Sequence, residues 1–233
     1  MQPSIPKHQP LGAQQGGQTR LPPAVHEEFS TDRQVLPECE HALLIVDFIN
    51  PLNFEGAHSI AEPALEAARA TRALRERLAG EGVPVIYAND NYGLWQSNFR
   101  SMVAYCKELP GCVGEMTRLI EPGPRDIAIL KPRHSAFYGT PLELLLDQMK
   151  VKKLILTGLA TDICVQMSAM DAYLRAYETW VPADCCAAES AGAHEGALRY
   201  MKEVLRCRTD AAGRSPAQAA EGRQRTTPAG AMH

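Results

Sequence analysis

Several ionisable side chains follow directly after short apolar runs of this sequence. Asp47 ends the run ALLIVD, Asn89 and Asp90 end PVIYAND, and Lys131 ends DIAILK. A fourth apolar run, KLILTG, leads into the turn GLATDIC, which contains Cys164. An Asp, a Lys and a Cys carried to one edge of a sheet can form an activated-nucleophile constellation. The sequence therefore points to covalent catalysis, provided that the sheet order places the three strands side by side.

Cys164 has the most informative position, because its segment reads as a strand, a tight turn and the start of a helix. We expect its thiol in the first helical turn, where unpaired N–H groups and the helix dipole favour the reactive thiolate. The same N–H groups could hold the oxyanion of a tetrahedral intermediate. Each residue also has an ordinary alternative: Cys164 as a small buried hydrophobe, Lys131 as a solvated strand end, and Asp47 as the cap of a turn.

Alternating strands and helices are expected to position these residues. Apolar runs predict strands over residues 42–47, 84–90, 126–131, 153–158 and 178–184. Helix-forming segments predict helices over residues 61–78, 141–149, 162–177 and 193–205. Strands that are almost wholly apolar are buried on both faces, and helical crossovers between them require a parallel sheet. The expected fold class is α/β, a single three-layer α/β/α domain with a doubly wound sheet, in which ligands bind beyond the carboxyl ends of the strands.

The composition limits the partners and the domain organisation. The 233 residues carry 24 Lys and Arg against 27 Asp and Glu, a net charge of −3, and 45% of them are hydrophobic. The near balance of charge argues against nucleic acid and anionic membranes as partners, and no apolar run approaches the roughly 20 residues of a membrane span. Residues 1–37 and 209–233 have the composition of flexible tails, so the working domain is expected over residues 38–208.

The cysteine and histidine patterns argue against structural cross-links and metal centres. Seven cysteines form an odd set without a C-x-x-C pair, which predicts reduced thiols rather than a disulfide framework or a zinc ribbon. Together with the lack of a signal-peptide pattern, this predicts a cytoplasmic protein. His58 and His194 have no partner at ligand spacing. No glycine-rich phosphate-binding motif follows any predicted strand, which argues against a nucleotide-binding module.

Three sequence blocks resemble, in order and spacing, the signature blocks of the isochorismatase-like cysteine hydrolases. The blocks are ALLIVDFIN, AILKPRHSAFYGTPLELLL and LILTGLATDICVQMSAMDAYLRAYETWVPADCCA. The resemblance spans about residues 41–207, and it implies a parallel six-stranded sheet with a catalytic triad of Asp47, Lys131 and Cys164. It also implies a non-proline cis peptide bond between Leu159 and Ala160, and an oxyanion hole formed by the N–H groups of Ala160 and Cys164.

Departures from the family pattern reduce the number of family branches whose activity is expected for this chain. The nicotinamidase branch binds zinc through an Asp-x-His pair and a later His, whereas the corresponding region here, NDNYGLWQSNF, has no histidine. We therefore expect no metal, and the implied mechanism needs no cofactor. The isochorismatase branch proper typically lacks the nucleophilic cysteine, so Cys164 argues against that branch. Ile49 stands where many relatives carry Gln, so a substrate contact from this side chain is not expected to carry over from the family.

The resemblance implies a cysteine hydrolase that cleaves a C–N bond of a small molecule, in an amide, carbamoyl or ureido group, through a thioester. A vinyl-ether hydrolase and a non-catalytic binding protein on the same fold are the alternatives. Family analogy further implies a homo-oligomer, a dimer or a tetramer. The candidate contact surfaces are the loops near Trp95 and the helix from Asp162.

Aromatic and polar residues after the strands are expected to wall the substrate pocket, since such sites combine apolar surface with few polar groups. They are Asn89, Asp90, Tyr92, Trp95, Phe137 and Tyr138. Each of these side chains has the alternative of a place in the core or in an interface. His134 lies close to Lys131 in sequence, and we expect a structural or solvent-facing role for it, with a hydrogen bond to substrate as the alternative.

Overall fold

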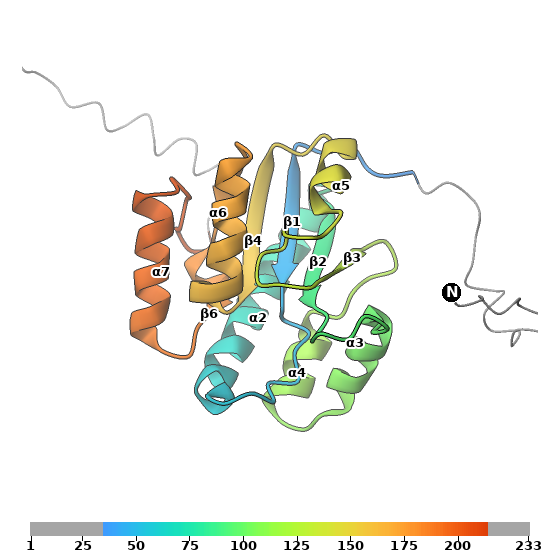
Figure 1. Ribbon diagram of the computed structural model, residues 1–233, viewed down its shortest axis with the longest axis vertical. Coiled ribbons are helices and arrows are strands. Elements are labelled where there is room, and N and C mark those ends of the chain that lie inside the picture. Colours follow the sequence, from blue (N-terminus) through green and yellow to red (C-terminus); the bar gives the residue numbers. More distant parts are fainter. Residues whose placement is uncertain (1–34, 214–233) are drawn as a thin grey trace, which may run out of the picture. The chain divides into compact units, whose positions relative to one another are not determined.

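The computed structural model describes residues 35–213, which contain one parallel six-stranded sheet with helices on both faces (Figure 1). The strands are β1 (His41–Val46), β2 (Val85–Asp90), β3 (Ile127–Lys131), β4 (Lys153–Leu159), β5 (Glu178–Trp180) and β6 (Cys186–Ala187). Their order is β3-β2-β1-β4-β5, and β6 pairs with the end of β4. The predicted α/β fold class and the implied six-stranded parallel sheet are confirmed.

Helices cover both faces of the sheet. They are α2 (Ala57–Gly80), α3 (Phe99–Glu108), α4 (Cys112–Leu119), α5 (Leu142–Gln148), α6 (Gln166–Leu174) and α7 (Ala191–Glu203). Two core clusters result: one contains buried side chains of α2, α3 and α4, and the other contains buried side chains of α5, α6 and α7. The sheet separates these two layers, so each strand must be apolar on both sides.

β1 shows how the sequence specifies this arrangement. Its side chains alternate between the two clusters, with Leu44 and Val46 in the cluster of α5 to α7, and Leu43 and Ile45 in that of α2 to α4. All four are fully buried. Burying one such aliphatic side chain contributes about 1.5–3 kcal/mol, so the run ALLIV is stable only as the central strand of a covered sheet.

The predicted elements agree with the structure to within about four residues except in three places, and β6 lies outside every predicted strand. Residues 99–108 and 112–119 form α3 and α4, which the sequence analysis did not predict. The predicted helix over residues 162–177 is a π-helical turn, Thr161–Val165, followed by α6. The predicted strand over residues 178–184 ends at Trp180, and the chain then forms the short 3-10 turn Ala183–Cys185 before β6.

The strand order places a ligand crevice at the centre of the sheet. From β1 the chain moves through β2 to β3, and it then returns across the sheet to β4 on the other side of β1. Ligands of such sheets bind beyond the carboxyl ends of the strands where the order reverses. Here that point lies between β1 and β4, the strands that precede Asp47 and Cys164.

The predicted tails, residues 1–37 and 209–233, fall mostly outside the described residues. Within the second range Asp210 accepts a hydrogen bond from Trp180 Nε1 at 2.9 Å, and Ala212 N donates to Asp184 Oδ1 at 2.7 Å. Across residues 35–213, no helix combines the length and the apolar character needed to cross a membrane.

Candidate active site

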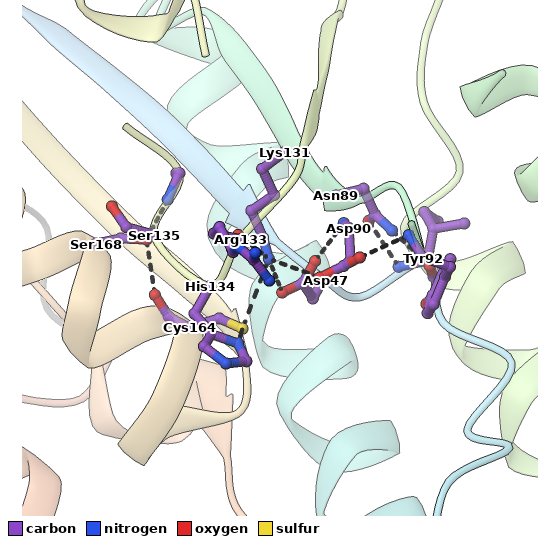
Figure 2. Close-up of polar contacts among 12 residues, drawn as sticks. Asp47, Asn89, Asp90, Tyr92, Lys131, Arg133, His134, Ser135, Cys164 and Ser168 are labelled. Carbon is purple, nitrogen blue, oxygen red and sulfur yellow. Dashed lines mark hydrogen bonds and ion pairs between the residues drawn. The ribbon is translucent and has the colours of Figure 1, made fainter. Parts of the chain in front are cut away.

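The ends of β1 and β3 and the turn after β4 bring the three candidate catalytic side chains together (Figure 2). Lys131 Nζ lies 2.7 Å from Asp47 Oδ2 and 3.6 Å from Cys164 Sγ. β2 separates β1 from β3 in the sheet, so the strands of Asp47 and Lys131 are not neighbours. The long lysine side chain bridges that gap, and strand adjacency proves unnecessary for this contact.

Asp47 is fixed by its backbone as well as by its carboxylate. It has a φ of 51°, in the left-handed region that Asp visits more readily than most residues. Its N–H donates to Ala88 O at 3.1 Å, and its Oδ1 accepts the backbone N–H of Asp90 at 2.7 Å. Burial raises the pKa of the Asp47 carboxyl, and the charge of Lys131 opposes this rise without cancelling it. The site thus holds a carboxylate that is more basic than an exposed one.

Lys131 is fully buried and shared among several acceptors. Besides Asp47 and the sulfur, its ammonium donates to Arg133 O at 3.2 Å and lies 3.6 Å from Asp90 Oδ2. Burial by itself would lower the pKa of Lys131, but the negative charge of Asp47 and its hydrogen bond to the ammonium, with a further contribution from Asp90, raise it above the ordinary value. The side chain is therefore a permanent cation at neutral pH.

The turn before Cys164 requires an unusual backbone. Gly158 has a φ of 136°, and a Cβ at this position would lie 2.0 Å from Val46 O. The peptide bond between Leu159 and Ala160 is cis. The π-helical turn Thr161–Val165 follows, and within it the N–H groups of Ile163 and Val165 both donate to Ala160 O. Such turns are rare and frequently occur at functional sites.

The electrostatics of the thiol differ from the sequence-based expectation. Burial raises the pKa of Cys164, the charge of Asp47 raises it further, and Lys131 lowers it only in part. A position near a helix start favours the thiolate, but in this resting site burial outweighs that effect. Cys164 therefore rests as a thiol, and a thiolate must be produced by transferring its proton to a neighbouring base.

The predicted pocket residues lie in different environments. Asn89 is buried, and its side-chain amide binds the backbone N–H and C=O of Ile49, so it fixes the segment after Asp47. Phe137 is a core residue with the Arg175 guanidinium 5.0 Å from its ring centroid. The Asp90 carboxylate accepts the N–H of Tyr92 at 2.6 Å.

The exposed members of the set lie in the loops beyond the strands. The exposed fraction is 41% for Tyr92, 84% for Trp95 and 64% for Tyr138. Although Tyr92 is partly exposed as a residue, burial of its hydroxyl end raises the pKa of that hydroxyl, and the negative charge of Asp47 raises it further, so the hydroxyl remains protonated.

Sequence reasoning missed the side chains that join the loop after Lys131 to α6 and to the turn that contains Cys164. Ser168 Oγ donates to Cys164 O at 2.7 Å and accepts the N–H of Ala136 at 2.9 Å. Ser135 Oγ donates to Asp171 Oδ2. Polar residues three and four positions apart, such as Ser168 and Asp171, mark one face of α6, and this spacing is the signal that could have identified them.

His134 was expected to have a structural or solvent-facing role. Its side chain is exposed, yet its Nδ1 lies 3.7 Å from Cys164 Sγ. His194, from α7, hydrogen-bonds Thr161 Oγ1 at 2.8 Å, within the π-helical turn that contains Cys164. Among residues 35–213, no three His, Cys, Asp or Glu side chains are arranged to hold a metal ion.

Comparisons with known proteins place this geometry in a family. The family model described as isochorismatase domain matches residues 41–212. The uncharacterized isochorismatase family protein YaaI of Bacillus subtilis is 36% identical over 170 residues, which cover 73% of this chain and 93% of that protein. The ureidoacrylate amidohydrolase RutB of Methylorubrum extorquens is 42% identical over 86 residues, but this match covers only 36% of the chain and 34% of RutB.

Solved structures share the fold over most of the chain. The N-carbamoylsarcosine amidase from Thermoplasma acidophilum has a TM-score of 0.60 and 25% identity, covering 76% of this chain and 99% of that one. An isochorismatase family protein from Desulfovibrio vulgaris has a TM-score of 0.61 and 24% identity, covering 80% of this chain and 99% of that one. The second likeness shows the fold alone.

Proposed function

Since the chain belongs to the isochorismatase family of hydrolases, we propose that it hydrolyses a C–N bond of a small molecule through a thioester on Cys164. One observation carries this proposal: a buried ammonium, Lys131, contacts both the Asp47 carboxylate and the Cys164 sulfur. A base, a cation and a thiol in mutual contact are what nucleophilic catalysis by cysteine requires. The ureido and carbamoyl compounds named for RutB and the N-carbamoylsarcosine amidase indicate the substrate class to test first.

The first half of the proposed reaction forms the thioester. Asp47 takes the thiol proton, Lys131 stabilises the resulting thiolate, and the sulfur attacks the substrate carbonyl carbon. The N–H groups of Ala160 and Cys164 hold the oxyanion. Asp47 then gives its proton to the leaving nitrogen, the C–N bond breaks, and an amine or ammonia departs.

The second half releases the acid. Water loses a proton to Asp47 and attacks the thioester, the C–S bond breaks, and the proton returns to the sulfur. The raised pKa of the buried Asp47 carboxyl suits this alternation, because it brings the basicity of the carboxylate closer to neutral pH. A thiol nucleophile must stay reduced, which fits the predicted cytoplasmic location.

Substrate contacts are assigned to residues at or beyond the carboxyl ends of the strands. We propose Asp90, Tyr92, Trp95 and Tyr138 as the pocket wall. For Asn89 and Phe137 the hydrogen bonds and burial described above support positioning roles instead. Asn89 holds the segment after Asp47, and Phe137 anchors the segment after Lys131 in the core.

The test of the proposed function is ammonia release from a panel of primary amides, carbamoyl amino acids and ureido acids. We expect turnover of at least one carbamoyl or ureido compound, with an equal rate in a parallel set that contains a chelator. Mass spectrometry of acid-quenched reactions should show an acyl adduct on the Cys164 peptide. Turnover without any such adduct would contradict the thioester route, and turnover abolished by the chelator would contradict the expectation that the reaction needs no metal.

Self-association is proposed from an exposed apolar stripe on the nucleophile helix. The stripe consists of Ile163, Met167, Met170, Tyr173 and Leu174, with exposed fractions between 37% and 72%. These residues recur at helical spacing on the outer side of the π turn and α6. An apolar stripe of this extent is typical of a subunit contact, and we propose a second copy of the chain as its partner.

Light scattering on a size-exclusion column tests this assignment. We expect a mass of at least twice the 25.5 kDa of the monomer. The substitution Met170→Glu should shift the mass toward the monomer, because it places a charge in an apolar contact. A substitution outside the stripe, His58→Glu on α2, is the matched control. A wild-type monomer would contradict the proposal.

A further inference from the structure

The sulfur of Cys164 has polar neighbours on two sides. On the buried side are the Lys131 ammonium and the Asp47 carboxylate. On the exposed side is the imidazole of His134, with Nδ1 3.7 Å from Sγ. Hydrogen bonds to sulfur are longer than those to oxygen, so the His134 contact is comparable with the 3.6 Å contact from Lys131. The thiol therefore has two candidate donors for its anionic form.

Lys131 by itself cannot donate a full hydrogen bond to the Cys164 sulfur. An ammonium has three hydrogens, whereas Lys131 Nζ faces four acceptors: Asp47 Oδ2 at 2.7 Å, Arg133 O at 3.2 Å, Asp90 Oδ2 at 3.6 Å and Cys164 Sγ at 3.6 Å. The contacts with Asp47 Oδ2 and Arg133 O are the two shorter ones, so the sulfur shares the remaining hydrogen with Asp90 Oδ2. A thiolate formed here lacks a full donor from the buried side.

We infer that His134 is a further catalytic residue, which donates its Nδ1–H to the Cys164 thiolate and stabilises it during attack. This inference rests on the proposed function, because it assigns the second donor of the same nucleophile. It requires only the imidazole tautomer or cation that carries hydrogen on Nδ1. No proton is transferred by His134: the thiol proton goes to Asp47, and the imidazole supplies a hydrogen bond to the anion that remains.

The chain position of His134 supports this role. The segment after Lys131 is tied to the nucleophile helix by Ser168, which bonds both Ala136 N and Cys164 O. Because His134 lies between Lys131 and this tie, its backbone is held beside the nucleophile, which keeps its ring within reach of the sulfur although the side chain is exposed. A histidine facing only solvent would have no such restraint.

The test measures thiol reactivity, which needs no substrate. The full-length protein is treated with iodoacetamide from pH 6 to pH 10, and alkylation of the Cys164 peptide is followed by mass spectrometry. The variants are His134→Ala, which removes the donor, His134→Asn, whose amide N–H can replace Nδ1–H, and His58→Ala, a matched change at an exposed histidine of α2. Asp47, Lys131 and Asp90, the charged groups around the sulfur, are unchanged in every variant.

We expect His134→Ala to slow alkylation of Cys164 at neutral pH about tenfold or more, and to shift the rate profile to higher pH, because a hydrogen bond to a charged group is lost. His134→Asn should recover most of the rate, and His58→Ala should match the wild type. If a substrate is found, kcat should fall with His134→Ala more than KM changes.

Two results would overturn the inference. An alkylation profile of His134→Ala within twofold of the wild type would mean that the imidazole merely lies over the site. Faster alkylation at every pH would mean that it shields the sulfur. Either result leaves the proposed hydrolase function intact. If that function were wrong instead, no compound of the substrate panel would be hydrolysed, while His134→Ala would still slow alkylation of Cys164.

Discussion

Replacement of Cys164 by alanine should abolish turnover of the best substrate in the panel and leave the fold unchanged. We expect the loss to be at least about a thousandfold in kcat, since removing the nucleophile of a covalent mechanism leaves only binding and oxyanion stabilisation. The fold should survive because the side chain is small and alanine fills part of its space. The measurement is steady-state kinetics together with the thermal unfolding midpoint of both proteins.

The matched control for this substitution is Cys207→Ala. Cys207 is also buried in the cluster of α5 to α7, and its Sγ donates to Leu205 O at 3.9 Å. It should retain turnover. Cys164→Ser should remain nearly inactive, because a hydroxyl is a far weaker acid than a thiol and Asp47 would not deprotonate it. Wild-type turnover in Cys164→Ala would show that the reaction does not use this thiol.

The central part of the fold could be predicted from the sequence because local and long-range signals agree there. The run ALLIV is apolar at every position, which only a strand covered on both faces satisfies. α3 and α4 could not be predicted in this way: at the start of α3 polar and charged residues such as Asn98 and Arg100 interrupt the apolar pattern, and only Val103 and Cys106 of this helix are buried. The contact with α4 and the core stabilises α3, and sequence periodicity alone does not reveal that contact.

The candidate site likewise has residues that the sequence could predict and contacts that it could not. Asp47, Lys131 and Cys164 are found in the sequence because each follows an apolar run. That Lys131 reaches across β2 to Asp47 depends on the strand order and on side-chain length, neither of which a single sequence displays. Asn89 and Phe137 look like pocket residues by type, but their burial is decided by the segments that pack on them.

The contact of His134 with the sulfur also had no sequence signal. The histidine is only three positions from Lys131, but where its ring points depends on how the segment after β3 folds back on α6. The pKa of Cys164 could not be predicted from the sequence for a similar reason. The sequence shows that Cys164 lies near a helix start, but it does not show how deeply the thiol is buried.

The Asp47→Asn variant should lose both turnover and stability. Asparagine retains an oxygen that can accept the Asp90 N–H but cannot take the thiol proton, so we expect kcat to fall by about a thousandfold or more.

In the wild type, kcat/KM should fall as the pH is lowered through the pKa of Asp47, because the protonated carboxyl is no base. Burial raises that pKa, so this acid limb should lie above the range of an ordinary carboxyl.

The stability of the same variant follows from the ion pair. Asp47→Asn leaves the fully buried Lys131 ammonium with only the more distant carboxylate of Asp90, 3.6 Å away. Breaking a buried pair in this way costs about 3–5 kcal/mol of folding free energy. The linkage has a defined sign: the folded pKa of Lys131 is raised, so its contribution is complete below its ordinary pKa and is lost as the pH rises through the folded value.

Urea unfolding at pH 7 separates the two effects of Asp47. The double variant Asp47→Asn with Lys131→Met should regain much of the lost stability, because methionine fills similar space without a charge, yet it should stay inactive. Asp90→Asn is the matched control and should cost less stability, because Lys131 keeps its 2.7 Å partner. If Asp47→Asn were as stable as the wild type while Lys131 remained charged, the pair would not stabilise the site, and the assignment of Lys131 as a permanent cation would fail.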